Sequence, residues 1–198
     1  MKKFIGLMVL SLVPAVLFAQ SPRSATGGEA KMLAGGEFSI YNPDWGCASN
    51  IVFNCSNELV GPTAFFDFNW NRRIGAEGDA HWLIWHGPQG QKESSYLLGP
   101  RYRLWQSERF GFSGRLGLGG EWLQTPGYPQ AGSLKGSFFA IAPGADLGYR
   151  LSDRTTVRVD YEYQFLPSFS GGPGHHGGLT PNGLSIGVAW KVLGVNGR

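Results

Sequence analysis

Apolar and polar residues alternate with a period of two along most of the chain after Lys31, and no helical period of 3.6 is found there. A period of two is typical of β-strands whose faces meet different surroundings, because successive side chains point to opposite sides. Eight segments carry it: residues 36–41, 63–71, 74–83, 95–104, 110–122, 138–151, 155–165 and 184–192. The pattern therefore predicts an all-β chain of eight strands.

The connections between these segments alternate in length. Three are short, at residues 72–73, 105–109 and 152–154. Four are long and rich in Gly, Pro, Asn and Ser, at residues 42–62, 85–94, 123–137 and 166–183. Short turns at one end and long loops at the other are typical of outer-membrane barrels. We therefore expect an antiparallel up-and-down meander, closed into an eight-stranded transmembrane β-barrel.

The two faces of the segments differ in charge. The apolar face carries no charged residue in any of the eight segments, as a lipid-facing surface requires, because a charge at the bilayer midplane costs about 2–4 kcal/mol. The polar face carries eight carboxylates and six bases: Glu37, Asp67, Glu77, Asp79, Glu121, Asp146, Asp160, Glu162, Arg101, Arg103, Arg115, Arg150, Arg158 and Lys191. His81 lies on the same face. We predict that these residues form a charge network in the lumen.

Aromatic residues of the apolar face fall into two groups along the predicted barrel axis. Near the short turns are Trp70, Tyr102, Phe110, Phe112, Tyr149 and Trp190, and near the long loops are Trp82, Tyr96, Trp122, Phe139, Tyr163 and Phe165. Two such rings predict the aromatic girdles of a membrane barrel. The alternative is a soluble, lipocalin-like ligand-binding barrel, which would pack the same aromatics inside.

The remaining composition bears on export and on partners. Residues 1–19 combine Lys2 and Lys3 with an apolar stretch and a small residue, which predicts a cleaved signal peptide. We expect a flexible lead-in at 20–32, the barrel at 33–193 and a short periplasmic tail at 194–198. Without the two lysines, 15 basic residues face 14 acidic ones, so the charge gives no reason to expect nucleic acid.

On these features the chain resembles the small porin-like outer-membrane β-barrel family, which includes the transmembrane domain of OmpA and its OmpX-like relatives. The resemblance implies residence in the outer membrane, with membrane lipid and the barrel assembly machinery as partners. The end of the last segment resembles the family's assembly signal at Gly187, Trp190 and Val192. It departs from that signal because Val192 replaces a terminal Phe and six residues follow.

Few residues suggest further chemistry. Cys47 and Cys55 share the first long loop of an exported chain, which predicts a disulfide. His175 and His176 lie in a glycine-rich stretch, where a solvated loop tip is favoured over loose metal binding. We expect no catalytic, cofactor or metal site, and the rival class is an outer-membrane enzyme acting on lipid.

The predicted role follows from the size of the barrel. Eight strands leave an interior just wide enough for side chains to fill, so a wide pore is disfavoured. The expected function is structural or interactive, in envelope integrity or adhesion through four surface loops that meet an extracellular ligand or surface. A narrow porin-like conductance remains open.

Overall fold

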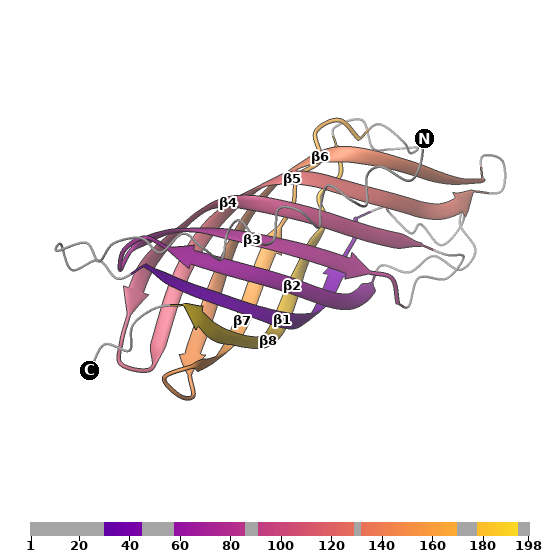
Figure 1. The fold of residues 1–198 in the computed structure, drawn as a ribbon. Coiled ribbons are helices and arrows are strands. Elements are labelled where there is room, and N and C mark those ends of the chain that lie inside the picture. The colour runs from indigo at the N-terminus through magenta and orange to yellow at the C-terminus, as the bar shows by residue number, and fades with distance from the viewer. Residues whose placement is uncertain (1–29, 45–57, 86–90, 129–131, 170–177, 194–198) are drawn as a thin grey trace, which may run out of the picture.

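The computed structural model describes residues 30–44, 58–85, 91–128, 132–169 and 178–193. These residues form eight strands: β1 (Lys31–Asn42), β2 (Leu59–Asn69), β3 (Ile74–Leu83), β4 (Lys92–Gln106), β5 (Phe110–Tyr128), β6 (Gly132–Arg150), β7 (Thr155–Tyr163) and β8 (Asn182–Leu193). Each strand pairs antiparallel with the next, and β8 pairs with β1 to close the barrel (Figure 1). The predicted fold class, an eight-stranded up-and-down barrel, is confirmed.

Most strands run further than the alternation predicted. β3 has the predicted bounds, but β5 and β6 continue pairing to Tyr128 and Gly132, so most of the loop expected at 123–137 is strand. β2 and β4 likewise begin inside the expected loops, and β1 begins at Lys31, two residues before the expected start of the barrel. Outward residues need to be apolar only where they meet lipid, whereas backbone pairing continues beyond the membrane.

The closure between β8 and β1 removes the free sheet edges. Their register runs from Met32 opposite Leu193 to Asn42 opposite Asn182, with one irregularity beside Met32. An open edge in lipid would leave unpaired N–H and C=O groups, each costing several kcal/mol. The turns after β2, β4 and β6 lie together at one end of the barrel, at the lower left in Figure 1.

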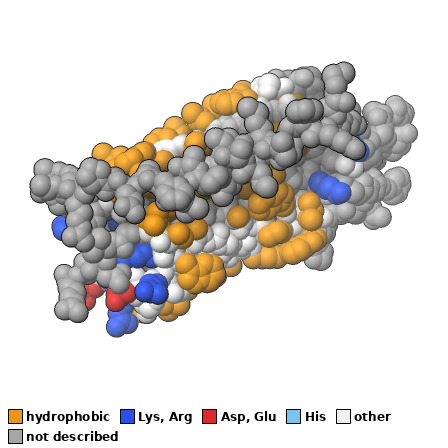
Figure 2. Space-filling model, viewed as in Figure 1, with side chains coloured by type: hydrophobic (Ala, Val, Ile, Leu, Met, Phe, Trp, Pro, Cys, Tyr) orange, Lys and Arg blue, Asp and Glu red, His pale blue; other side chains and the backbone are white. Residues whose placement is uncertain are grey.

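The outer surface is apolar and the interior is polar, the reverse of a soluble barrel. Large apolar side chains such as Leu118 and Leu184 are 43% and 56% exposed on the outside, whereas inward residues such as Asp67 and Glu162 are buried. In Figure 2 apolar side chains form several patches on the part of the outer face that is not grey. An apolar surface of this extent is stable in lipid, not in water. Within the described residues, no helix is long and apolar enough to span a membrane.

Candidate functional site

Three buried arginines, Arg101, Arg115 and Arg158, occupy the interior and come from β4, β5 and β7. The pleat of these strands turns every second side chain inward, which brings the polar faces of all the strands together. The guanidinium groups form ion pairs with seven buried carboxylates: Glu37, Asp67, Glu77, Asp79, Asp146, Asp160 and Glu162. The structure thus brings ten of the fifteen predicted lumen residues into one three-arginine network.

Glu77 of β3 is the centre of the three-arginine network. Its Oε2 lies 2.9 Å from Nε of Arg101 and its Oε1 lies 3.1 Å from Nη1 of Arg115. The same Oε1 also accepts a hydrogen bond from Nη2 of Arg158. The guanidinium of Arg158 stacks over the ring of Phe65 at 4.2 Å, a cation–π contact that holds it in place. These contacts fill the middle of the lumen with side chains.

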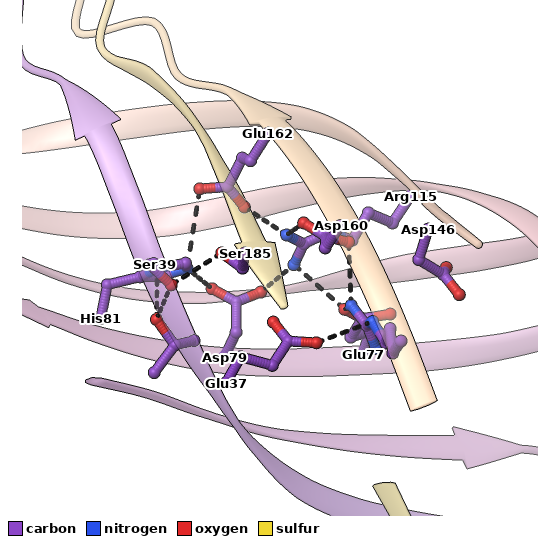
Figure 3. Close-up of polar contacts among 12 residues, drawn as sticks. Glu37, Ser39, Glu77, Asp79, His81, Arg115, Asp146, Asp160, Glu162 and Ser185 are labelled. Atoms are coloured by element: carbon purple, nitrogen blue, oxygen red, sulfur yellow. Dashed lines mark hydrogen bonds and ion pairs between the residues drawn. The ribbon is translucent and has the colours of Figure 1, made fainter. Parts of the chain in front are cut away.

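His81 lies further along the axis, away from the turns, and is 1% exposed. One ring nitrogen, Nδ1, lies 3.0 Å from the hydroxyl of Thr63, which is itself hydrogen-bonded to Ser39. The other, Nε2, lies 3.0 Å from Oδ1 of Asp79 and 3.7 Å from Oε1 of Glu162. Figure 3 shows His81 between Ser39 on one side and Asp79 and Glu162 on the other. The histidine therefore joins a hydroxyl chain on one side to two carboxylates on the other.

Arg115 orients both of the carboxylates that face His81. Its Nη1 contacts Oδ2 of Asp79, and its Nη2 lies 2.7 Å from Oε2 of Glu162. Each carboxylate therefore gives one oxygen to the guanidinium and turns the other toward Nε2 of the histidine (Figure 3). One cation thus fixes the geometry of a three-residue cluster.

The carboxylates near His81 differ in the number of hydrogen bonds that they accept. Glu162 also accepts hydrogen bonds from the hydroxyl of Tyr41 at 3.1 Å and the amide of Gln164 at 2.7 Å. Glu93 and Glu121 are both fully buried, and neither carboxylate has a hydrogen-bond partner among the described residues. Glu93 was absent from the sequence-based set because the fourth segment was begun at Ser95, although the same alternation extended by two residues would have included it.

An apolar cluster, which we call the outer plug, closes the lumen beyond this layer. It consists of Tyr41, Leu59, Leu83, Leu123, Leu166, Phe169 and Leu179, with Phe138 packed against them. Leu83 and Leu123 each stand two residues beyond a buried polar residue, His81 and Glu121, on the same face of the strand. The alternation predicted a charge network in the lumen and did not predict the outer plug.

Three predicted network members lie at the turn end of the barrel. Arg103 is half-buried and donates to Oε1 of Gln106 at 3.1 Å, and Lys191 is half-buried on β8. Arg150 is exposed and donates to the backbone oxygen of Glu108, because it stands at the end of β6 where the chain leaves the barrel. Arg150 lines the mouth of the lumen at the turn end together with Arg101 and Asp146, and its membership of the charge network stays a prediction.

The twelve predicted girdle aromatics all point outward. Ten are exposed; Tyr149 packs on Phe110 with ring centroids 4.9 Å apart, and Trp82 donates to the hydroxyl of Tyr96 at 3.0 Å. The ring centroids of Tyr96 and Trp122 are 5.4 Å apart, so side chains from β3, β4 and β5 form one aromatic patch. The patch lies toward the outer plug, where Trp82 pairs opposite Ser94 near the end of β3.

A sequence profile described as "Outer membrane protein beta-barrel domain" matches residues 10–191, which is most of the chain. The chain belongs to this family. It is accordingly an integral β-barrel protein of the cell outer membrane, as its apolar outer surface also indicates. No match was found among curated proteins.

Solved structures of this family type share the fold. OprG from Pseudomonas aeruginosa is 13% identical with a TM-score of 0.54, and 83% of this chain covers 96% of that one. The attachment invasion locus protein Ail of Yersinia pestis is 18% identical with a TM-score of 0.52, covering 83% of this chain and 98% of Ail. The N-terminal barrel of OprF from Pseudomonas aeruginosa is 12% identical with a TM-score of 0.52, covering 81% and 98%. These likenesses establish the fold alone.

The last strand of this family member has the geometry that a closing strand needs. Trp190 and Val192 are exposed on the outside, and Gly187 lies opposite Glu37 of β1. A Cβ at Gly187 would collide with the backbone oxygen of Gly36, so only glycine permits this close approach of β8 to β1. The reading of these residues by the assembly machinery stays a prediction.

Several predicted features lie outside the described residues. They are the signal peptide at 1–19, the disulfide between Cys47 and Cys55, the pair His175 and His176, and the tail at 194–198. Each of these stays a prediction.

Proposed function

We propose that this protein is a closed, non-enzymatic scaffold that holds its outer connections at the cell surface and does not act as an open pore. The observation that carries the proposal is the double obstruction of the lumen. The three-arginine network fills its middle, and the outer plug closes the end opposite the turns. An eight-stranded barrel has little interior space beyond its side chains. Ions therefore meet both a fixed charge lattice and an apolar barrier.

The surface role follows from what the closed barrel leaves available. Its turns at one end are short, so recognition falls to the connections at the other end, and loops on a rigid scaffold commonly carry binding. Ail, a structural neighbour, is named as an attachment invasion locus protein. We assign this chain an equivalent kind of role, in which the outer connections meet an extracellular ligand or surface or support envelope integrity.

The position of His81 supports a non-enzymatic role. An enzyme acting on membrane lipid needs its base on the lipid-facing surface, but this imidazole is buried in the lumen among Thr63, Asp79 and Glu162. Incubation of the purified barrel with outer-membrane lipid should release no fatty acid above a heat-denatured control. Release that scales with folded protein would reassign the chain to the enzymes.

Planar-bilayer recording tests the closed lumen. We expect at most small, intermittent currents from wild-type protein whose folded state is verified by different gel migration before and after boiling. Flotation of reconstituted liposomes supplies the insertion control, because it counts inserted barrels whether or not they conduct. A large, steady conductance from protein inserted to the same level would overturn the scaffold and make the chain a porin.

A further inference from the structure

The described interior carries more negative than positive charge. Nine buried carboxylates face three buried arginines and one buried histidine. Buried charges in proteins are paired or coordinate metals, because an unpaired charge in a low-dielectric interior is very costly. The three-arginine network accounts for seven carboxylates by sharing each guanidinium among several of them. An additional positive species is therefore needed, and we expect it near Glu93 and Glu121, the two buried carboxylates that the three-arginine network leaves out.

The geometry of one cluster suits a bound cation. Nε2 of His81, an oxygen of Asp79 and an oxygen of Glu162 all lie within 4.8 Å of one another. The imidazole nitrogen is 3.0 Å from the first oxygen and 3.7 Å from the second. Ligand atoms around a tetrahedral zinc ion, bound at about 2.0–2.1 Å, are ~3.4 Å apart. The observed separations bracket that value, so small side-chain shifts suffice.

The groups behind these three ligands have the arrangement found around metal sites. A metal-bound histidine is usually held through its other ring nitrogen, and ligating carboxylates are held by further hydrogen bonds. Here Thr63 holds Nδ1 of His81, while Arg115 takes the far oxygens of Asp79 and Glu162. The remaining ligand atoms, Nε2 of His81, Oδ1 of Asp79 and Oε1 of Glu162, face one another (Figure 3). A metal ion there would replace the hydrogen bonds that Oε1 of Glu162 accepts from Tyr41 and Gln164.

An independent observation marks the same layer. Glu93 and Glu121 are completely buried, and none of their four carboxylate oxygens has a hydrogen-bond partner in the described part of the chain. Glu93 is near enough to His81 and Glu162 to interact with both electrostatically, and Glu121 interacts with Glu93 and Glu162. Two unpartnered carboxylates beside the cluster favour a cation there.

We propose that His81, Asp79 and Glu162 form a binding site for a divalent transition metal inside the barrel. One imidazole with two carboxylates suits zinc and its neighbours better than magnesium or calcium, which prefer oxygen ligands alone. Glu93 adds negative charge beside the site, through its electrostatic interaction with His81 and Glu162. This site departs from the expectation that the chain holds no metal, which took His81 only as part of a polar network.

The surroundings make the site a structural one. The outer plug closes it from one side and the three-arginine network from the other. Metal bound during folding would therefore exchange slowly with solvent. It would also join β3 to β7 across the lumen, since Asp79 and His81 lie on β3 and Glu162 on β7.

The test is metal content after folding. The full chain is folded into detergent micelles with Zn²⁺ present, free metal is removed, and zinc is counted per barrel by elemental analysis. Wild-type protein should retain about one zinc. His81→Asn should retain less than a tenth of that, while His175→Asn/His176→Asn, a matched control for adventitious loop binding, should retain it fully. Gel migration before and after boiling verifies that each variant is folded.

A second variant keeps the test decisive if His81→Asn fails to fold. Thr63→Val leaves all three ligands in place and removes only the hydroxyl that orients the imidazole. We expect it to weaken zinc affinity by about 10–100-fold, the usual effect of losing such a supporting group. Folded wild-type barrel without zinc would overturn the proposal and leave protons as the neutralising species. Zinc lost only from the His175/His176 variant would overturn it as well.

Discussion

Arg158 shows how much a single residue holds together. Its guanidinium pairs with Glu37 at 3.2 Å and Asp160 at 3.0 Å, contacts two further carboxylates and stacks on Phe65. Arg158→Met keeps much of the bulk but leaves Glu37 without an arginine partner and removes one of the counter-charges of the other three carboxylates. Removing one partner of a buried ion pair costs about 3–5 kcal/mol. We expect a loss of that size in the free energy of unfolding, measured by urea titration of barrels in lipid.

Arg103 supplies the matched control for this prediction. It is half-buried on β4, and its hydrogen bond goes to the neutral side chain of Gln106. Arg103→Met removes the same charge from the same kind of strand, but a partly solvated charge contributes little, so we expect a loss of about 1 kcal/mol or less. Equal losses for the two variants would show that the three-arginine network does not stabilise the barrel.

At the scale of the strand, the sequence contained most of the architecture. Alternation identified eight strands, and β3 was predicted with its observed bounds because Ile74 and Leu83 are flanked by clear changes of pattern. The alternation failed to identify the inward residues at the outer end of the barrel, where the inward face changes from polar to apolar. Leu83 and Leu123 face inward in the register of His81 and Glu121, but an inward leucine looks like the end of the pattern, so the outer plug was missed.

The candidate metal cluster illustrates a different limit of sequence reasoning. Asp79 and His81 are two residues apart and were predicted to share a face, but Glu162 lies on β7. β7 is not a neighbour of β3 in the sheet. Their approach depends on closure of the barrel and on side-chain length across the lumen, neither of which periodicity specifies. The sequence alone therefore predicted most of the inward charges, although not Glu93, and the tertiary structure shows which of them are partners.

The strand that closes the barrel yields a prediction of its own. Trp190 pairs opposite Ala34 of β1 and Thr155 of β7, so β8 is bonded on both sides up to this point. Deleting residues 190–198 removes that pairing and should abolish assembly, because the freed strand edges are not tolerated in lipid. Residues 194–198 follow the end of β8, so deleting them should leave assembly unchanged. The measurement is the amount of protease-resistant barrel recovered from outer membranes. If the shorter deletion also prevents assembly, the last strand extends beyond Leu193 and its end has been assigned too early.

In the whole molecule, the side chains inside the barrel form distinct layers in order along its axis. Basic residues stand near the turns, the three-arginine network follows, then the His81 cluster, and the outer plug lies at the far end. Outside, an uncharged band separates two groups of aromatics. Ion pairs fill the middle of the lumen and apolar side chains fill its outer end. This arrangement supports the proposed role as a closed scaffold.

The band facing lipid can be tested by its depth dependence. Leu118 of β5 is exposed between the aromatics Phe112 and Trp122, whereas Leu104 is exposed two residues before the end of β4 at the turn. An arginine at the bilayer midplane costs about 2–4 kcal/mol and near the interface about 0–1 kcal/mol. Leu118→Arg should therefore lower the free energy of unfolding in lipid vesicles far more than Leu104→Arg. In detergent micelles, which lack a midplane of fixed depth, the difference should shrink. Equal effects in vesicles would mean that the membrane does not lie where the two aromatic groups indicate.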